Sequence, residues 1–165
     1  MAVGWTAAAG SVCSDTNIFN GFTDNTNLAQ VCKIHYPAVA FTPIWKGATT
    51  DPVIGNGTLA GSISGRGKFR TYTISMSAGS TTTFGSGVWY FSLAGSNNVA
   101  ASNNVGVVYG LDDGAAFRVG ACYIAAGGNK IYMVSDGGGN SWSSSIPHTW
   151  ATNDYLRLQI DIELS

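Results

Sequence analysis

Strict alternation of apolar and polar side chains near the C-terminus limits the fold of this chain more than any other feature of its sequence. In YLRLQIDIEL (155–164), every even-numbered position is Leu or Ile, and the odd positions from 157 to 163 are Arg, Gln, Asp and Glu. Successive side chains of a β-strand point to opposite faces of its sheet. The segment is therefore predicted to be a strand with one buried face and one solvated face.

The same period of two recurs along the chain. KFRTYTISM (68–76) places Tyr72, Ile74 and Met76 on one face, and KIYMV (130–134) is a shorter strand of the same kind. VGVVYGL and FRVGACYIA repeat the pattern, and their apolar faces carry Val105, Val107, Tyr109 and Leu111 in the first and Phe117, Val119, Ala121 and Tyr123 in the second. VWYFSL (88–93) is apolar on both faces, which predicts a central strand covered twice.

Turn residues separate these segments at intervals of about ten residues, as expected for an all-β fold and not for βαβ units. The turn signals are Asp51-Pro52, Asn56-Gly57, Asp113-Gly114, Gly127-Gly128 and the three glycines at 137–139. We therefore predict one domain over residues 36–165. Its fold class is an all-β, antiparallel β-sandwich, jelly-roll-like, with about eight strands.

Residues 1–35 carry scattered apolar groups without a sustained period, so they are predicted to form an irregular N-terminal arm used for docking or assembly. Ordering such a segment costs about 1–2 kcal/mol per residue, so its large apolar side chains need a surface to bury against. That surface belongs to its own domain, to a sister copy or to a larger assembly. The predicted anchors are Trp5, Phe19, Phe22 and Leu28.

The chain carries little charge, and this restricts its partners. Only 10% of the residues are charged, against roughly 25% in an average soluble domain, and the net charge is −1. Weak repulsion between copies favours association. The near-neutral balance provides no field that attracts nucleic acid or an anionic membrane, and no apolar run reaches the ~18 residues of a membrane span. We expect neither nucleic-acid binding nor membrane insertion, and the first residues lack the pattern of a secretory signal.

Residues that carry catalytic or metal chemistry are few and badly spaced for it. Cys13, Cys32 and Cys122 are odd in number without metal-site spacing, so they are predicted to be separate thiols. His148 lies in a loop, and no G-x-S-x-G motif occurs. Asp112 and Asp113 run into a glycine, which is typical of a hairpin turn and not of paired catalytic carboxylates. We expect no enzyme activity, no cofactor and no metal.

Two groups of residues support hypotheses of binding. Trp142 lies among Gly, Asn and Ser, and Trp150 follows His148, so an exposed ring at either position would stack on a sugar or anchor a partner. The alternative is that each ring folds back onto the sheet edge or a sister chain. RGKFR places Arg66, Lys68 and Arg70 two residues apart on one strand face, which indicates a solvated strand or an edge strand protected by charge, with salt links between subunits as the alternative.

Four collinear segments resemble a β-domain that is common in tailed-phage structural proteins, often at the C-terminal end of tail-fibre or minor tail proteins. They are FTPIWKGATTDPVIGNGTLAGSISGRGKF, MSAGSTTTFGSGVWYFSL, LDDGAAFRVGACYI and TWATNDYLRLQIDIEL. The resemblance extends from Ala40 to Ser165. It implies a bacteriophage virion protein and a tendency to form homotrimers.

Fibre proteins of this family usually carry a long shaft or tail-binding region ahead of the domain, whereas about 35 residues precede it here. This favours a capsid decoration (cement) protein or a short head fibre. Such a protein docks by its arm on the major capsid protein or other virion proteins and exposes a trimeric sandwich on a virion assembled in the host cytoplasm. The alternative is a tail-fibre tip, a receptor-binding domain that recognises host-surface glycans. Copy number separates the two, because decoration proteins are numerous on a particle and fibre tips are few.

Overall fold

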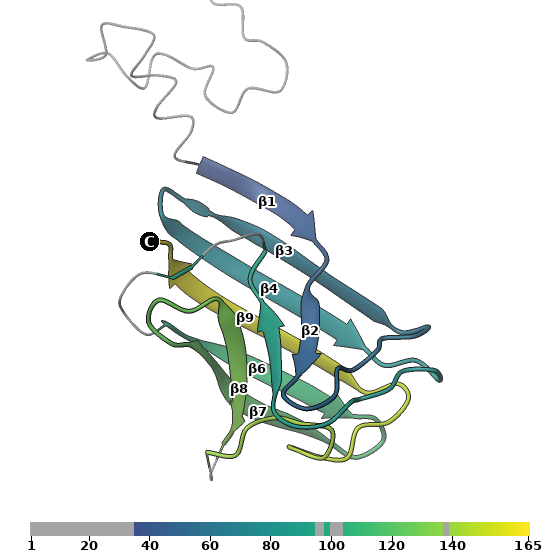
Figure 1. Ribbon diagram of the computed structural model, residues 1–165. Coiled ribbons are helices and arrows are strands. Elements are labelled where there is room, and N and C mark those ends of the chain that lie inside the picture. The colour runs from purple at the N-terminus through teal and green to yellow at the C-terminus, as the bar shows by residue number, and fades with distance from the viewer. Residues whose placement is uncertain (1–34, 95–97, 100–103, 137–138) are drawn as a thin grey trace, which may run out of the picture.

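The computed structural model describes residues 35–94, 98–99, 104–136 and 139–165, and in this part of the chain nine antiparallel strands form a single sheet (Figure 1). The strands are β1 (His35–Phe41), β2 (Ile44–Gly47), β3 (Thr58–Arg66), β4 (Phe69–Ser77), β5 (Trp89–Ser92), β6 (Asn104–Asp112), β7 (Ala116–Ile124), β8 (Lys130–Ser135) and β9 (Tyr155–Glu163). The all-β prediction is confirmed. None of the described residues forms a helix able to cross a membrane.

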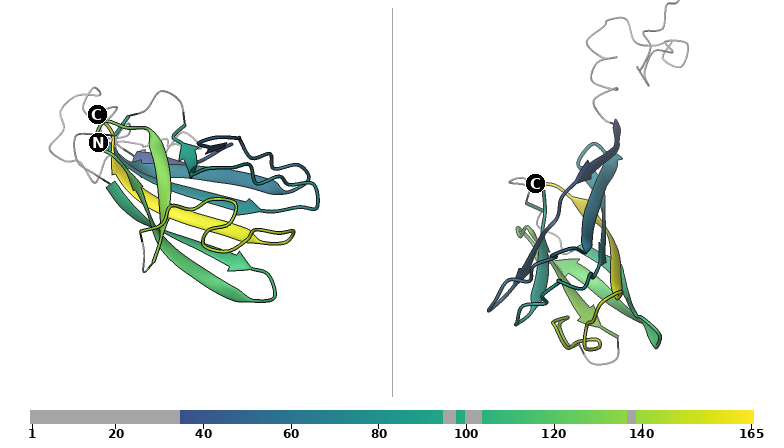
Figure 2. Two further views of the ribbon diagram at one scale, coloured as in Figure 1. Left: turned by 60° about the horizontal axis from the view of Figure 1, so that its bottom comes forward. Right: turned by 90° about the vertical axis from the view of Figure 1, so that its right-hand side faces the viewer.

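The sheet is curled upon itself. Its strand order is β1-β3-β4-β9-β6-β7-β8-β5-β2, so β1 and β2 are its two outermost strands. Only Thr42 and Pro43 lie between them, so the Cα atoms of Phe41 and Ile44 are three steps apart, about 11 Å at most. The two edges of the sheet must therefore approach each other at this link. Figure 2 shows the resulting half-barrel, one continuous curled sheet where a two-layer jelly-roll sandwich was predicted.

The core fills the inside of the curl. The strand over 155–163 places its Leu and Ile residues inward as its alternation predicts, and β4 contributes Tyr72, Ile74 and Met76 beside them. Four tryptophans complete the core, Trp45, Trp89, Trp142 and Trp150, and each exposes 6% of its surface or less. Their rings contact one another at centroid distances of 4.8 Å for Trp45–Trp89, 5.3 Å for Trp89–Trp150 and 5.8 Å for Trp142–Trp150.

Strands β6 and β7 bury Val108 and Ile124 in this core but turn Val107, Phe117 and Val119 away from it. The predicted alternation is present, but the inward positions include Gly110 and Gly120, beneath the rings of Trp142 and Trp150. A Cβ added to Gly110 would lie 3.0 Å from Trp150 Cη2, and one added to Gly120 would lie 3.2 Å from Trp142 Nε1. On the opposite parity, Phe117 is 63% exposed. At positions 110 and 120 the tryptophan rings, and at 120 also the carbonyl of Val134, leave little space for a side chain.

The predicted arm lies outside the described residues except for His35, which begins β1. The same holds for all four of its predicted anchors, Trp5, Phe19, Phe22 and Leu28.

Replacing Gly106 in β6 with alanine tests the close packing of the inward face. The new Cβ would lie 2.7 Å from Ile160 Cα, so the backbone of β6 or β9 would have to shift. We expect the free energy of unfolding to fall by about 1–3 kcal/mol in urea titrations. Val107→Thr, at the adjacent outward position that is 58% exposed, is the control and should change it by less than about 0.5 kcal/mol. Equal unfolding midpoints for the two variants would contradict the packing described.

Candidate functional site

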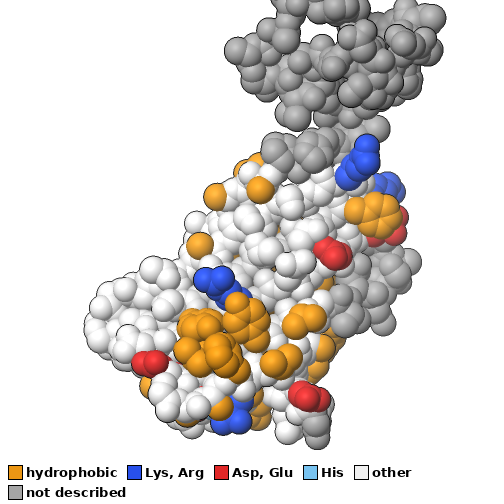
Figure 3. All heavy atoms as spheres, turned by 180° about the vertical axis from the view of Figure 1, so that it is seen from behind, with side chains coloured by type: hydrophobic (Ala, Val, Ile, Leu, Met, Phe, Trp, Pro, Cys, Tyr) orange, Lys and Arg blue, Asp and Glu red, His pale blue; other side chains and the backbone are white. Residues whose placement is uncertain are grey.

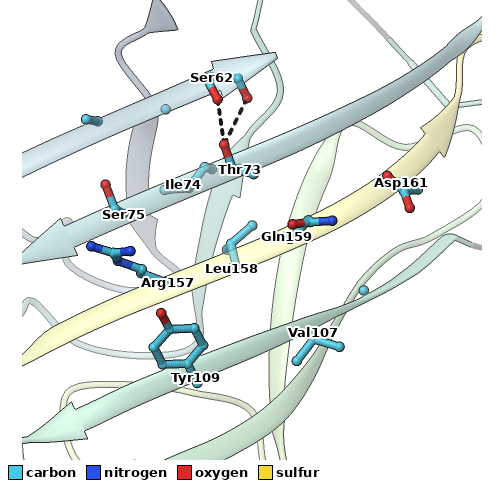
Figure 4. Close-up of a pocket in the computed structure, with 13 residues that line it drawn as sticks. Ser62, Thr73, Ile74, Ser75, Val107, Tyr109, Arg157, Leu158, Gln159 and Asp161 are labelled. Atoms are coloured by element: carbon cyan, nitrogen blue, oxygen red, sulfur yellow. Dashed lines mark hydrogen bonds between the residues drawn. The ribbon is translucent and has the colours of Figure 1, made fainter. Parts of the chain in front are cut away.

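The outer face of β3, β4, β9 and β6 is hollowed into a groove of about 950 Å³ (Figure 4). Its depth follows from the residues that each strand turns outward. The outward positions of β3 and β4 carry short side chains, whereas those of β9 and β6 carry longer ones. The side chains that line the groove include Ala60, Ser62, Thr73, Ser75, Val107, Tyr109, Arg157, Gln159 and Asp161.

Polar side chains line the groove beside apolar surface, and hydrogen bonds hold some of them in place. Ser62 Oγ and Thr73 Oγ1 lie 2.6 Å apart on directly paired residues of β3 and β4. Thr71 Oγ1 donates to Asp161 Oδ1 at 2.5 Å. Hydroxyl, amide and guanidinium groups thus face solvent beside the phenol of Tyr109, which suits a ligand rich in hydroxyl groups. Among the described residues that line the groove, Asp161 supplies the single carboxylate.

An apolar surface adjoins the groove, and we call it the aromatic patch: Val107, Tyr109, Phe117, Val119 and Tyr155. Val107, Phe117 and Val119 are 57–63% exposed. Tyr155 meets Tyr109 edge-on at 6.1 Å between ring centroids and Phe117 at 6.4 Å. Figure 3 shows hydrophobic side chains gathered on this back face of the molecule. The residues come from β6, β7 and β9, so three paired strands hold them in place.

The hypothesis of exposed rings does not hold for Trp142 and Trp150, which fold back onto their own sheet as the alternative interpretation expects. Their side chains are buried, with 0% and 4% of the surface exposed. Trp142 packs over β6 and β7, and Trp150 contacts Trp89 and donates from Nε1 to the carbonyl of Ile146 at 3.4 Å. The polar residues around Trp142 in the sequence belong to a loop that inserts the ring into the open side of the half-barrel. Neither ring offers a face to a glycan.

The basic cluster Arg66, Lys68 and Arg70 does not share one strand face. The segment is a hairpin in which Gly67, at φ +60°, turns the chain from β3 to β4. Arg70 points inward, is 9% exposed and donates to the carbonyls of Gly67 and Phe69. Arg66 and Lys68 are exposed. Both β3 and β4 are flanked by other strands, so the hypothesis of a charged edge strand is also wrong.

His148 and Asp154 form a buried pair at the base of the loop that precedes β9. His148 Nε2 lies 3.2 Å from Asp154 Oδ2, and the backbone amides of Asp113 and Ala151 donate to the same carboxylate at 2.9 and 2.7 Å. Asp112 offers a further oxygen, and one ligand atom from each of Asp112, His148 and Asp154 lies within 4.8 Å of the others. Because backbone N–H groups already occupy the carboxylate, this arrangement fits a loop that is fastened to the β6–β7 hairpin.

Cys122 is a free, buried thiol, in agreement with its predicted separate state. Burial raises its pKa to about 12, which keeps it protonated and unreactive near neutral pH. Cys13 and Cys32 lie outside the described residues.

The alternation alone did not reveal which side chains of β6 and β7 face outward and so form the exposed surface next to the groove. The signal was present in the glycines at 106, 110 and 120, which share the inward parity. Small residues in one register indicate that bulky side chains approach from that side.

Comparisons with known proteins bear on the fold. No family model matches the chain, and no curated protein matches its sequence. Among solved structures, the crystal structure of the Dettilon tailspike protein (gp208) is similar to this chain with a TM-score of 0.55 and 13% sequence identity. The match covers 78% of this chain and 24% of the tailspike, so the chain corresponds to about a quarter of that protein. The two share a fold.

Replacing Asp154 with asparagine tests the role of the buried carboxylate. The substitution removes the charge and one acceptor oxygen, so a buried donor loses its partner. We expect the free energy of unfolding to fall by about 1–3 kcal/mol in urea titrations. Asp113→Asn makes the same chemical change at an exposed turn residue and should stay within about 0.5 kcal/mol of the wild type. If both variants match the wild type, the carboxylate does not fasten the loop.

Proposed function

We propose that this chain is a structural protein of a tailed-phage virion that is associated with the tail. The observation that carries the proposal is the fold that its β-domain shares with a segment of a tailspike protein. The resemblance of Ala40–Ser165 to phage tail-fibre and minor tail proteins supports it, as do the low charge and the exposed aromatic patch. The proposed assembly is a homotrimer on the virion surface that contacts other virion proteins through residues 1–35.

The capsid decoration role is the other structural proposal, with the major capsid protein as the partner. The fold shared with a tailspike favours the tail over the capsid. Both roles need association and stability, and neither needs a reaction.

Gold-labelled antibodies raised against the full chain test this proposal on purified phage particles. We expect labelling at the tail, with few copies per particle by quantitative mass spectrometry. Labelling over the whole capsid with many copies per particle would contradict the tail-associated role and support the capsid decoration role. Particles that carry no label and no peptide of the chain would contradict both.

A second candidate function is recognition of a host-surface glycan, and the groove is the observation that favours it. Sugars present hydroxyl groups that bind amide, hydroxyl and guanidinium partners, and their apolar faces stack on aromatic rings. The groove brings Arg157, Gln159 and Tyr109 together on adjacent strands, with Tyr109 and Arg157 directly paired. In this proposal the glycan binds to these groove residues and not to Trp142 and Trp150, which are buried.

Arg157→Ala is expected to weaken the binding of a glycan selected from an array by about tenfold or more in titration calorimetry. The reason is that a hydrogen bond to a charged group contributes about 1.5–3 kcal/mol. Arg118→Ala removes an equally exposed charge outside the groove and should leave the affinity unchanged. The glycan should be recovered intact by mass spectrometry after incubation, since we propose binding without turnover. Equal affinity for wild type and Arg157→Ala would refute the groove as the site.

A further inference from the structure

We propose that the aromatic patch is the surface through which one copy of this chain contacts another, an inference that rests on the proposed structural role. The patch lies in the middle of the sheet and not at its edges. Among the described residues, three of the seven large hydrophobic side chains that are most exposed belong to it, and the other four, Val39, Ile44, Val53 and Phe69, are dispersed over other elements.

The side chains of the patch have the properties of interface anchors. Contiguous exposed apolar surface of this kind marks sites of interaction, and buried aromatic residues dominate the energy of protein interfaces. Tyr155 contacts both Tyr109 and Phe117 edge-on, and each of the three residues projects from a strand that is hydrogen-bonded on both sides. Because the backbone beneath them is fixed, little conformational entropy remains to be lost when a partner covers them.

The charges beside the patch favour a copy of the same chain as the partner. Arg157 pairs with Tyr109 across β6 and β9, and Asp161 lies four residues further along the same outward row, about 13 Å away. An identical face therefore offers an opposite charge for each. A strongly acidic or basic partner finds no complementary field on such a surface.

The double variant Phe117→Thr/Val119→Thr tests the proposal by sedimentation velocity of the full chain over a range of concentrations. Threonine favours β-strands, and both positions are exposed, so the fold should persist, with an unchanged circular dichroism spectrum. We expect the wild type to sediment as an oligomer and the variant to require at least tenfold higher concentration to associate. The control is Phe69→Thr, which removes a phenyl ring that is 64% exposed in the β3–β4 hairpin and should leave the association unchanged.

A second measurement retains the apolar character of the patch. A benzoylphenylalanine in place of Phe117 should cross-link two copies on illumination, and the same probe at position 69 should not. A monomeric wild type at all concentrations overturns both this inference and the proposed self-assembly. A wild-type oligomer that the double variant does not weaken overturns the patch alone. The two proposals can fail separately. Phage particles without label would refute the virion role, whereas dissociation of the oligomer by the double variant would still support the patch as the contact surface.

Discussion

Tryptophan rings packed against glycines in β6 and β7 hold the curled sheet together. Trp142 and Trp150 fill the open side of the half-barrel and approach the backbone at Gly110 and Gly120, and Trp89 joins them to the ring of Trp45. The backbone supports this packing, because the amide of Trp89 donates to the carbonyl of Trp142 and the amide of Trp142 donates to Met133. Burying rings of this size provides a large share of the apolar stabilisation available to a sheet that has no second layer.

The same packing determines what the protein presents to its surroundings. Glycine fits beneath the rings at positions 110 and 120, and the large side chains at the alternate positions, Tyr109, Phe117 and Val119, point outward and form the aromatic patch. Next to it, the short outward side chains of β3 and β4 create the groove. The side chains that β6 and β7 turn to the core and those that they turn to solvent are therefore fixed together. A one-residue shift in the register of these strands would move each side chain to the opposite face.

Sequence periodicity predicted the elements of this fold better than their arrangement. The alternation in 155–164 and 68–76 identified two central strands and their buried faces, because polar residues fill the opposite parity there. From Val105 to Leu111 of β6 both parities lack charge, so the pattern identified a strand without indicating which side met the core. The RGKFR segment was taken as one strand because its alternation continues through the turn, and Gly67 alone marked the reversal. The position of Trp142 stayed open between an exposed and a folded-back ring because its neighbours in sequence are polar, whereas its contacts come from other parts of the chain.

The position of β9 has a consequence for how the protein is made. This strand comes last in the described chain, yet it lies between β4 and β6 in the sheet. During synthesis on the ribosome, the backbone groups of β4 and β6 that face β9 therefore have no partner strand until residues 155–163 have emerged. The nascent polypeptide completes this hydrogen-bonded ladder only after residues 155–163 have been made, so folding depends on contacts between distant parts of the chain and is correspondingly slow.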